Sequence, residues 1–193
     1  MSGGARHARP SATVAGAAAP RIQLRDIVLA DADLIDAWGA DPANAGEFND
    51  FGRTHEPVDR DALAKGPLRN DKNGALMIER VSDGEPVGSV GWHRVGYGPN
   101  TESGAWNIGI SLLPEARFQG YGVEAQRMLA AYLFATTGVN RVEAQTDVDN
   151  VPEQRALEKA GFAREGVARG SQFRTGAYHG LVTYSRLRDD PAG

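Results

Sequence analysis

Two glycines stand between a strand-like run and a helix-like run in the stretch PEARFQGYGVEAQRMLAAYLF, residues 114–134. A helix that begins directly after a strand leaves its first N–H groups without intrahelical partners, with the positive end of the helix dipole behind them. Such a helix start binds phosphate, and Gly120 and Gly122 carry no side chain to block a bulky anion. Arg117 adds a cationic group. Glycines that merely ease the turn are the alternative.

The spacing of these glycines argues against two common phosphate-binding motifs. The stretch lacks the Gly-Lys-Ser/Thr ending of a nucleoside-triphosphate P-loop, so that motif is unsupported. Ala125 stands where the dinucleotide-binding fingerprint has its third glycine, so the match to that motif is weak. The phosphate that such a loop would bind therefore has to be identified from the rest of the chain.

Composition narrows the class of protein. The chain has 193 residues, 41% of them hydrophobic, which is enough for one globular domain with a proper core. A formal net charge of −4 argues against a nucleic-acid partner, which would require a basic excess. With no cysteine, the chain has no disulfide, no cysteine-based zinc site and no cysteine nucleophile. The composition fits a reducing, cytoplasmic location.

The two ends differ from the middle of the chain. Residues 1–20 are small, polar or alanine-rich and are predicted to form a disordered leader. A signal peptide is the alternative, but the run VAGAAA lacks the leucines and isoleucines of a signal core. Residues 189–193 form a polar tail, which leaves 21–188 as the domain. No apolar run approaches the length of about 18 residues that a membrane helix needs.

Hydrophobic periodicity and turn residues predict a mixture of strands and helices. Three consecutive strands without a helix between them exclude a pure βαβ alternation. We therefore expect an α/β domain with a mixed, mostly antiparallel sheet of about seven strands flanked by helices. The strands are expected at 22–29, 74–81, 86–98, 104–113, 140–148, 162–170 and 180–187, and the helices at 31–42, 58–66, 122–137 and 150–161, with residues 43–73 otherwise irregular.

Two blocks of the sequence together resemble one family. Arg117-x-x-Gly120-x-Gly122, after the strand NIGISLLP and before a long helix, resembles the Arg/Gln-x-x-Gly-x-Gly/Ala signature of the GNAT superfamily of acetyl-CoA-dependent N-acetyltransferases. The block DVDNVPEQRALEKAGFAREG is similar to that superfamily's strand–Asn–helix–Gly-Phe segment, with Asn150 eleven residues before Gly161, as in the RimJ/RimL-like branch. The opening RIQLRDIVLADADLIDAW and the final GAYHGLVTYSRL are similar to the same branch, so the resemblance covers residues 21–188.

The resemblance implies a binding site for acetyl-CoA. Main-chain groups near Leu112 and Leu113 would meet the pantetheine and the thioester, in a wedge between their strand and the strand RVEAQTDV. The side chain of Asn150 would bond the pantetheine arm, although an Asn there is also an ordinary helix N-cap. The backbone amides that would hold the pyrophosphate are those of Arg117, Phe118, Gln119, Gly120, Tyr121, Gly122 and Val123.

The catalytic residues of the family are less well matched. Asn107 stands where RimJ/RimL-like proteins often carry Glu, and an amide cannot act as a base, although it can orient a water or an amine. Leu157 stands where many members carry a general-acid Tyr, and Gly180 replaces a common Asp. Direct transfer to an amine requires no nucleophilic residue, so the absence of cysteine is no objection.

Two other residues are candidates for proton transfer. If GWHRVGYG and AWNIGI pair as a hairpin, His93 lies roughly opposite Asn107, and an imidazole can deprotonate an amine. A histidine that merely fills the strand surface is the alternative. Glu153 in the first turn of the Asn150 helix is a further candidate, although Glu is also common at helix starts for electrostatic reasons. His55 and His179 lack metal-ligand spacing, so no metal site is predicted.

The sequence therefore predicts an N-acetyltransferase that moves an acetyl group from acetyl-CoA to a primary amine. The acceptor would be a protein N-terminus or a small amine such as an antibiotic or amino sugar. Glu47 and Asp50 could attract a cationic amine, although solvated loop carboxylates are the alternative. The competing hypothesis is a non-catalytic acyl-CoA-binding protein, which Asn107 and Leu157 favour. A homodimer is compatible with the resemblance, and neither a nucleic acid nor a membrane is expected as a partner.

Overall fold

Seven strands form one sheet at the centre of residues 19–191, the part of the chain that the computed structural model describes. Their order is β1-β2-β3-β4-β5-β7-β6, and all neighbours are antiparallel except the parallel pair β4 and β5. This confirms the mixed, mostly antiparallel sheet. The strands are β1 (Ile22–Asp26), β2 (Asn73–Arg80), β3 (Pro86–Gly96), β4 (Gly104–Leu112), β5 (Arg141–Asp147), β6 (Ala163–Arg174) and β7 (Ala177–Leu187).

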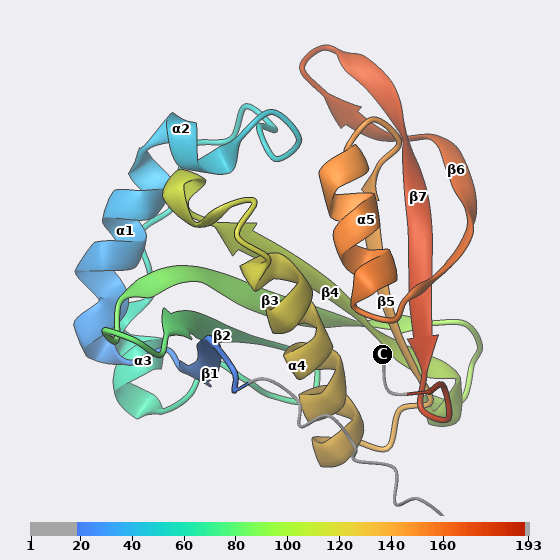
Figure 1. Ribbon diagram of the computed structural model, residues 1–193, viewed down its shortest axis with the longest axis horizontal. Coiled ribbons are helices and arrows are strands. Elements are labelled where there is room, and N and C mark those ends of the chain that lie inside the picture. Colours follow the sequence, from blue (N-terminus) through green and yellow to red (C-terminus); the bar gives the residue numbers. More distant parts are fainter. Residues whose placement is uncertain (1–18, 192–193) are drawn as a thin grey trace, which may run out of the picture.

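Helices cover both faces of the sheet (Figure 1). α4 (Tyr121–Thr136) and α5 (Val151–Lys159) lie on one face, where α4 crosses the central strands and contacts α5. α1 (Ala32–Ala40) and α3 (Arg60–Lys65) pack on the other face, and α2 (Pro42–Ala45) follows α1. None of the helices in the described part of the chain is long and apolar enough to cross a membrane.

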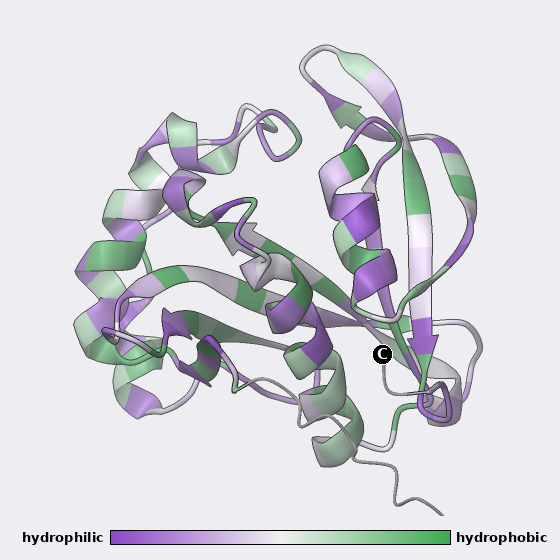
Figure 2. Cartoon of the chain, viewed as in Figure 1, coloured by the Kyte–Doolittle hydropathy of each residue, from purple (hydrophilic) through white to green (hydrophobic). Residues whose placement is uncertain are grey.

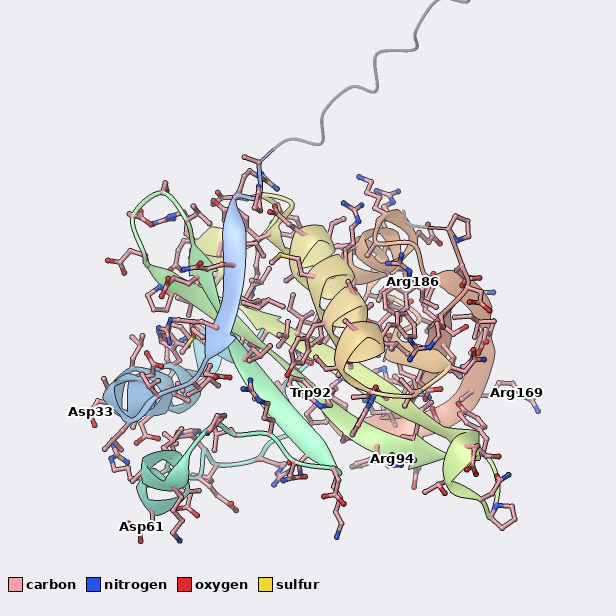
Figure 3. All side chains as sticks on the ribbon, turned by 90° about the horizontal axis from the view of Figure 1, so that it is seen from below. Asp33, Asp61, Trp92, Arg94, Arg169 and Arg186 are labelled. Atoms are coloured by element: carbon pink, nitrogen blue, oxygen red, sulfur yellow. The ribbon has the colours of Figure 1, made fainter. Side chains whose placement is uncertain are left out.

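Alternation along the strands assigns their residues to the two helix layers. Leu76 and Ile78 on β2 join the main core under α4, whereas Met77 between them packs with α1 and α3. Trp92 points from β3 toward α4 (Figure 3), and its ring lies 5.8 Å from that of Tyr132. The central strands and α4 are accordingly richer in hydrophobic residues than α5 (Figure 2). Alternate residues of one strand thus contribute to the hydrophobic clusters on opposite faces of the sheet.

The first expected strand is too long. β1 ends at Asp26, and residues 29–31 form a 3-10 turn that leads into α1. The Asp31 carboxylate accepts the Val28 N–H at 2.8 Å and pairs with Arg25 at 2.7 Å, so the chain turns away from the sheet. Asp31 occupies the N-cap position of α1 as expected, but its side chain makes no capping hydrogen bond to that helix.

Two other segments are more regular than expected. α2 lies within the region expected to be irregular; Pro42 begins it and the Asp41 side chain accepts the Ala43 N–H at 3.0 Å. β6 and β7 extend to a tight turn at Thr175 and Gly176, both at positive φ, so their hairpin is longer than the two predicted strands. Residues 1–18, which form most of the expected leader, and 192–193 of the tail lie outside the described residues.

Candidate active site

The sheet is open along part of the boundary between β4 and β5. The two strands pair only at Trp106–Ile108 with Val142–Ala144, although β4 continues to Leu112 and β5 to Asp147. Beyond the paired residues β4 stays on β3 and β5 stays on β7, so the two strands diverge. The opening lies beside the starts of α4 and α5 and has the wedge shape expected from the sequence.

The glycine-containing loop forms the start of α4. Gly120 is the N-cap residue at φ +83°, a left-handed conformation that favours glycine. Gly122 lies in the first turn, and a Cβ there would stand 3.9 Å from Ile110 and 3.7 Å from Leu112 of β4. In the described chain, residues 118–123 donate none of the backbone hydrogen bonds made outside the regular elements. The loop therefore presents N–H groups beside the opening and has room for an anion.

Arg117 and Phe118 take unexpected positions in this loop. The Arg117 guanidinium donates to the carbonyl of Leu112 at 3.0 Å and to that of Asn44 at 2.5 Å, so it joins β4 to α2. Its charge is thus engaged by carbonyls instead of extending toward a phosphate, and its backbone N–H donates to the Pro114 carbonyl at 3.3 Å. Phe118 has φ +60° and a ring that is 90% exposed.

Asn150 caps α5 at the other side of the opening. Its Oδ1 accepts the Glu153 N–H at 3.3 Å, which is the N-cap interaction that the sequence allowed. The amide nitrogen of the same side chain remains a potential donor to a ligand, so both readings of Asn150 are compatible. Leu157, one turn beyond Glu153, is fully buried in the core.

Glu153 lies on the α4 side of the sheet. Gln126 of α4 donates to its Oε1 at 2.8 Å. Burial raises the pKa of the Glu153 carboxyl to about 7, although the hydrogen bond from Gln126 acts in the opposite direction. A carboxyl group with this pKa can hold or release a proton near neutral pH.

His93 and Asn107 lie together on the opposite face. The register of β3 and β4 pairs these two residues directly, as the hairpin model predicted. Asn73, His93, Asn107, Glu143 and Ser185 form one row across five strands. The three catalytic candidates therefore do not converge: His93 and Asn107 share the α1 side, and Glu153 is separated from them by the sheet.

Glu143 is a functional candidate that sequence reasoning missed. Its carboxylate accepts from Asn107 Nδ2 at 3.2 Å, from Arg141 Nε at 2.8 Å and from the Tyr97 hydroxyl. The hydrogen bond to Glu143, followed by burial, raises the pKa of Tyr97. A carboxylate thus lies next to Asn107 but is supplied by the neighbouring strand. An acidic residue between the apolar residues of RVEAQ is the sequence signal that could have indicated it.

Two cavities flank the segment that follows α2. A cavity of about 920 Å³ reaches from Trp38 and Phe51 to Ser89 and Ser111 of the sheet. A second one, of about 520 Å³, is lined by Glu47, Asp149, Arg174 and His179, and Asp50 lines both. The acidic side chains expected to attract a cation are thus at the cavity walls on the α1 side.

The two histidines without metal-ligand spacing each have an acidic partner. His55 lies 3.1 Å from Asp36, whose pKa is lowered to about 2, first by the Val58 N–H and then by His55. His179 lies 3.3 Å from the buried carboxylate of Asp147. Within residues 19–191 there is no cluster of three or more His, Asp or Glu side chains able to hold a metal ion.

Comparison with known proteins places the chain among acetyltransferases. Residues 21–163 match the family model of the acetyltransferase (GNAT) domain. The chain is 26% identical over 178 residues to the uncharacterized N-acetyltransferase p20 of Bacillus licheniformis, a match that covers 90% of this chain and 96% of that protein.

Two solved structures have the same fold. One is spermidine N-acetyltransferase from Vibrio cholerae in complex with CoA and spermine, with a TM-score of 0.72 at 18% identity, over 88% of this chain and 97% of the other. The second is ribosomal-protein-S5-alanine acetyltransferase from Vibrio fischeri, with a TM-score of 0.71 at 19% identity, over 89% and 95% of the two chains. At these identities the likeness concerns the fold.

Proposed function

The chain belongs to the GNAT family of acetyltransferases, and on this premise we propose how its residues bind acetyl-CoA and an amine. Proteins of this family are N-acetyltransferases that use acetyl-CoA, which supplies the acetyl group as a reactive thioester. We assign the donor site to the opening between β4 and β5, on the side of α4 and α5. The acceptor site is assigned to the cavities on the side of α1.

The residues at the opening fit coenzyme A. The start of α4 offers N–H groups and the positive end of a helix dipole to the pyrophosphate; Gly120 takes the left-handed conformation that begins the helix, and Gly122 adds no side chain beside it. Leu112 and Leu113 would meet the arm through their main chains, and Asn150 through its side chain. The side-chain amide of Gln126 lies beside Gly122, and its buried Oε1 atom has no hydrogen-bond partner in the described chain. The parting of β4 from β5 beside this loop is the observation that carries the proposal.

The acceptor is proposed to be a primary amine that arrives as a cation. Glu47 and Asp50 line the cavities on the α1 side and would attract it. The amine must lose a proton before it attacks the thioester. His93, which lines neither cavity, is proposed to take that proton through water that Asn107 orients. Glu153 lies on the donor side, where it cannot contact the amine without crossing the sheet.

We place the chain in the RimJ/RimL-like branch, as its sequence blocks suggest. Support comes from the similar fold of ribosomal-protein-S5-alanine acetyltransferase. The spermidine enzyme has the same fold, so a small amine is the second candidate acceptor beside a protein N-terminus. The cytoplasmic location and the homodimer expected from the sequence stay predictions.

Release of the CoA thiol tests the proposed reaction. We expect thiol release from acetyl-CoA with at least one member of a panel that contains an alanine-initiated peptide, spermidine and an aminoglycoside. Calorimetric titration with acetyl-CoA is run in parallel, with CoA-free protein as the starting material. Binding without release for every amine would favour the non-catalytic acyl-CoA-binding alternative. Absence of binding would contradict the donor site itself.

A further inference from the structure

A polar pair, formed by the buried Gln126 and the half-buried Glu153, joins α4 to α5 at the edge of the proposed donor site. Gln126 is 2% exposed, and its Nε2 donates to Glu153 Oε1 at 2.8 Å. Gln126 Oε1 has no hydrogen-bond partner among residues 19–191. Leaving a buried amide oxygen without a hydrogen bond destabilises a folded protein. Such a cost in a well-packed core suggests that a ligand supplies the missing donor.

The surroundings of the pair locate it in the wall of the opening. Gln126 Nε2 lies 4.0 Å from the position that a Cβ on Gly122 would occupy, and Ile110 and Leu112 of β4 border the same position. On the α5 side, Asn150 accepts the Glu153 N–H. The pair is therefore next to the glycine loop and next to the residues assigned to the pantetheine arm.

The charged side chains of the neighbouring elements are engaged elsewhere. On α4, Glu124 pairs with Arg21, and Arg127 donates to the Lys159 carbonyl. On β5, the Asp147 carboxylate pairs with Arg174. Glu153 consequently lacks a cationic partner in the described chain, and burial raises its pKa to about 7. A protonated Glu153 has an O–H donor in addition to its acceptor.

The pantetheine arm of coenzyme A contains amide groups, and each amide has one N–H donor and one C=O acceptor. We propose that Gln126 and Glu153 form a binding site for the amide groups of this arm, and that the arm binds when Glu153 carries a proton. Gln126 Oε1 then accepts an amide N–H of the arm, and the Glu153 hydroxyl donates to an amide carbonyl of the arm. This inference rests on the proposed function, because it requires acetyl-CoA at the opening.

Proton uptake on binding is the direct consequence. Above neutral pH the free protein holds Glu153 ionised, and binding of the arm requires one proton from solution. The dissociation constant of acetyl-CoA should therefore rise about twentyfold from pH 6.5 to pH 8.5, since affinity falls by up to tenfold per pH unit above the pKa of the free protein. Below that pKa the affinity should vary little from this cause.

Titration calorimetry measures the uptake without any turnover. Acetyl-CoA is titrated into the protein at pH 8 in buffers of different ionisation enthalpy, and the slope of the observed enthalpy gives the protons bound. We expect close to one proton for the natural chain and a smaller number, by nearly one, for Glu153→Gln. That variant should also lose most of the twentyfold pH dependence. Adenosine 3′,5′-bisphosphate, which has no pantetheine arm, is the control ligand and should give the same proton count with both proteins.

The outcomes separate this inference from the proposed function. If acetyl-CoA binds and Glu153→Gln takes up as many protons as the natural chain, the inference is overturned and the donor site stands. If the two proteins also differ by one proton with adenosine 3′,5′-bisphosphate, Glu153 responds to the phosphate end and the assignment to the arm is wrong. If acetyl-CoA fails to bind, the proposed function itself fails. Gln126→Leu, which retains the bulk of the side chain, should weaken acetyl-CoA binding about tenfold by removal of one hydrogen bond.

Discussion

At the scale of single residues, the side chains around Asn107 indicate which group can accept a proton from the amine. Asn107 is neutral, and the carboxylate beside it, Glu143, is held by Asn107, Arg141 and Tyr97. A carboxylate with these partners is suited to hold Asn107 in place. His93, directly opposite Asn107, is exposed and is the other titratable group in the row. We therefore expect proton transfer on the acceptor side to depend on His93.

Replacement of His93 tests this assignment. His93→Ala should lower kcat/KM about 100-fold and remove the ascending limb that a histidine base gives to the pH–rate profile. His93→Gln keeps a polar side chain of similar size but cannot titrate, so it should behave like the alanine variant. Recovery of activity in His93→Gln would indicate a role in spacing alone. A normal pH–rate profile in both variants would remove His93 from the mechanism.

At the scale of elements, two arginines hold α2 and the segment that follows it. Arg117 donates to the Asn44 carbonyl, and Arg174 of β6 donates to the Glu47 carbonyl at 2.6 Å. Arg117 follows β4, and Arg174 lies on β6, beyond β5 and β7 in the sheet, so the two arginines come from opposite sides of the opening between β4 and β5. The loop before α4 and the cavities beside α2 are thereby joined, because Arg117 lies in the same loop as Gly120.

The directions of the two glycines predict different effects of substitution. A Cβ on Gly120 would meet Arg21, whereas one on Gly122 would point toward Ile110, Leu112 and Gln126. Gly122→Glu should therefore reduce acetyl-CoA affinity at least 100-fold, through steric exclusion and charge repulsion of about 3 kcal/mol. Gly122→Ala meets only ordinary contacts, so it should fold normally and stabilise the helix by a few tenths of a kcal/mol.

For both Gly122 variants, calorimetry with acetyl-CoA measures the affinity, and urea unfolding measures the stability of the fold. Equal affinities for Gly122→Glu and the natural chain, in a folded variant, would contradict the assignment of the loop.

At the scale of the whole molecule, a buried ion pair fastens the β6–β7 hairpin to the sheet. The Asp147 carboxylate, fully buried at the end of β5, pairs with Arg174 at 2.5 Å. Burial acts to raise the pKa of Asp147, but the Asp149 N–H and Arg174 outweigh it and hold the pKa below its usual range. On the same hairpin, Arg141 and then Ser185 lower the pKa of Glu165 to about 2.

These depressed pKa values predict a loss of stability in acid. A carboxylate with a lowered pKa in the folded state stabilises the protein above its unfolded pKa of about 4 and loses that contribution as the pH falls through the folded pKa. The free energy of unfolding, measured with urea, should hence decrease between about pH 4.5 and pH 2. Asp147→Asn should cost about 3 kcal/mol at pH 7, because Arg174 would remain buried without its counter-charge.

The double variant Asp147→Leu with Arg174→Met is the control, since it removes both charges. It should regain a large part of that stability. A double variant as unstable as Asp147→Asn would show that packing, and not the charge pair, accounts for the loss.

The prediction of elements succeeded where periodicity was strong and failed where side chains redirect the chain. β2, β3, β4, α4, β5 and α5 lie close to the expected ranges, because their alternating or helical apolar patterns agree with burial. The end of β1 was missed, since it depends on Asp31 binding Val28 and Arg25. α2 is short enough that one proline and the Asp41 cap decide it.

The sequence by itself determined the family and indicated the proposed donor loop, because the order of Gly120, Gly122, Asn150 and Gly161 is a local pattern that needs no tertiary information. The tertiary structure decided which groups meet. It paired His93 with Asn107, supplied Glu143 beside them, and placed Glu153 against Gln126 on the other face of the sheet. The reason is that strand register and helix packing alone determine which face a side chain enters, and a shift of one residue in either would exchange the faces.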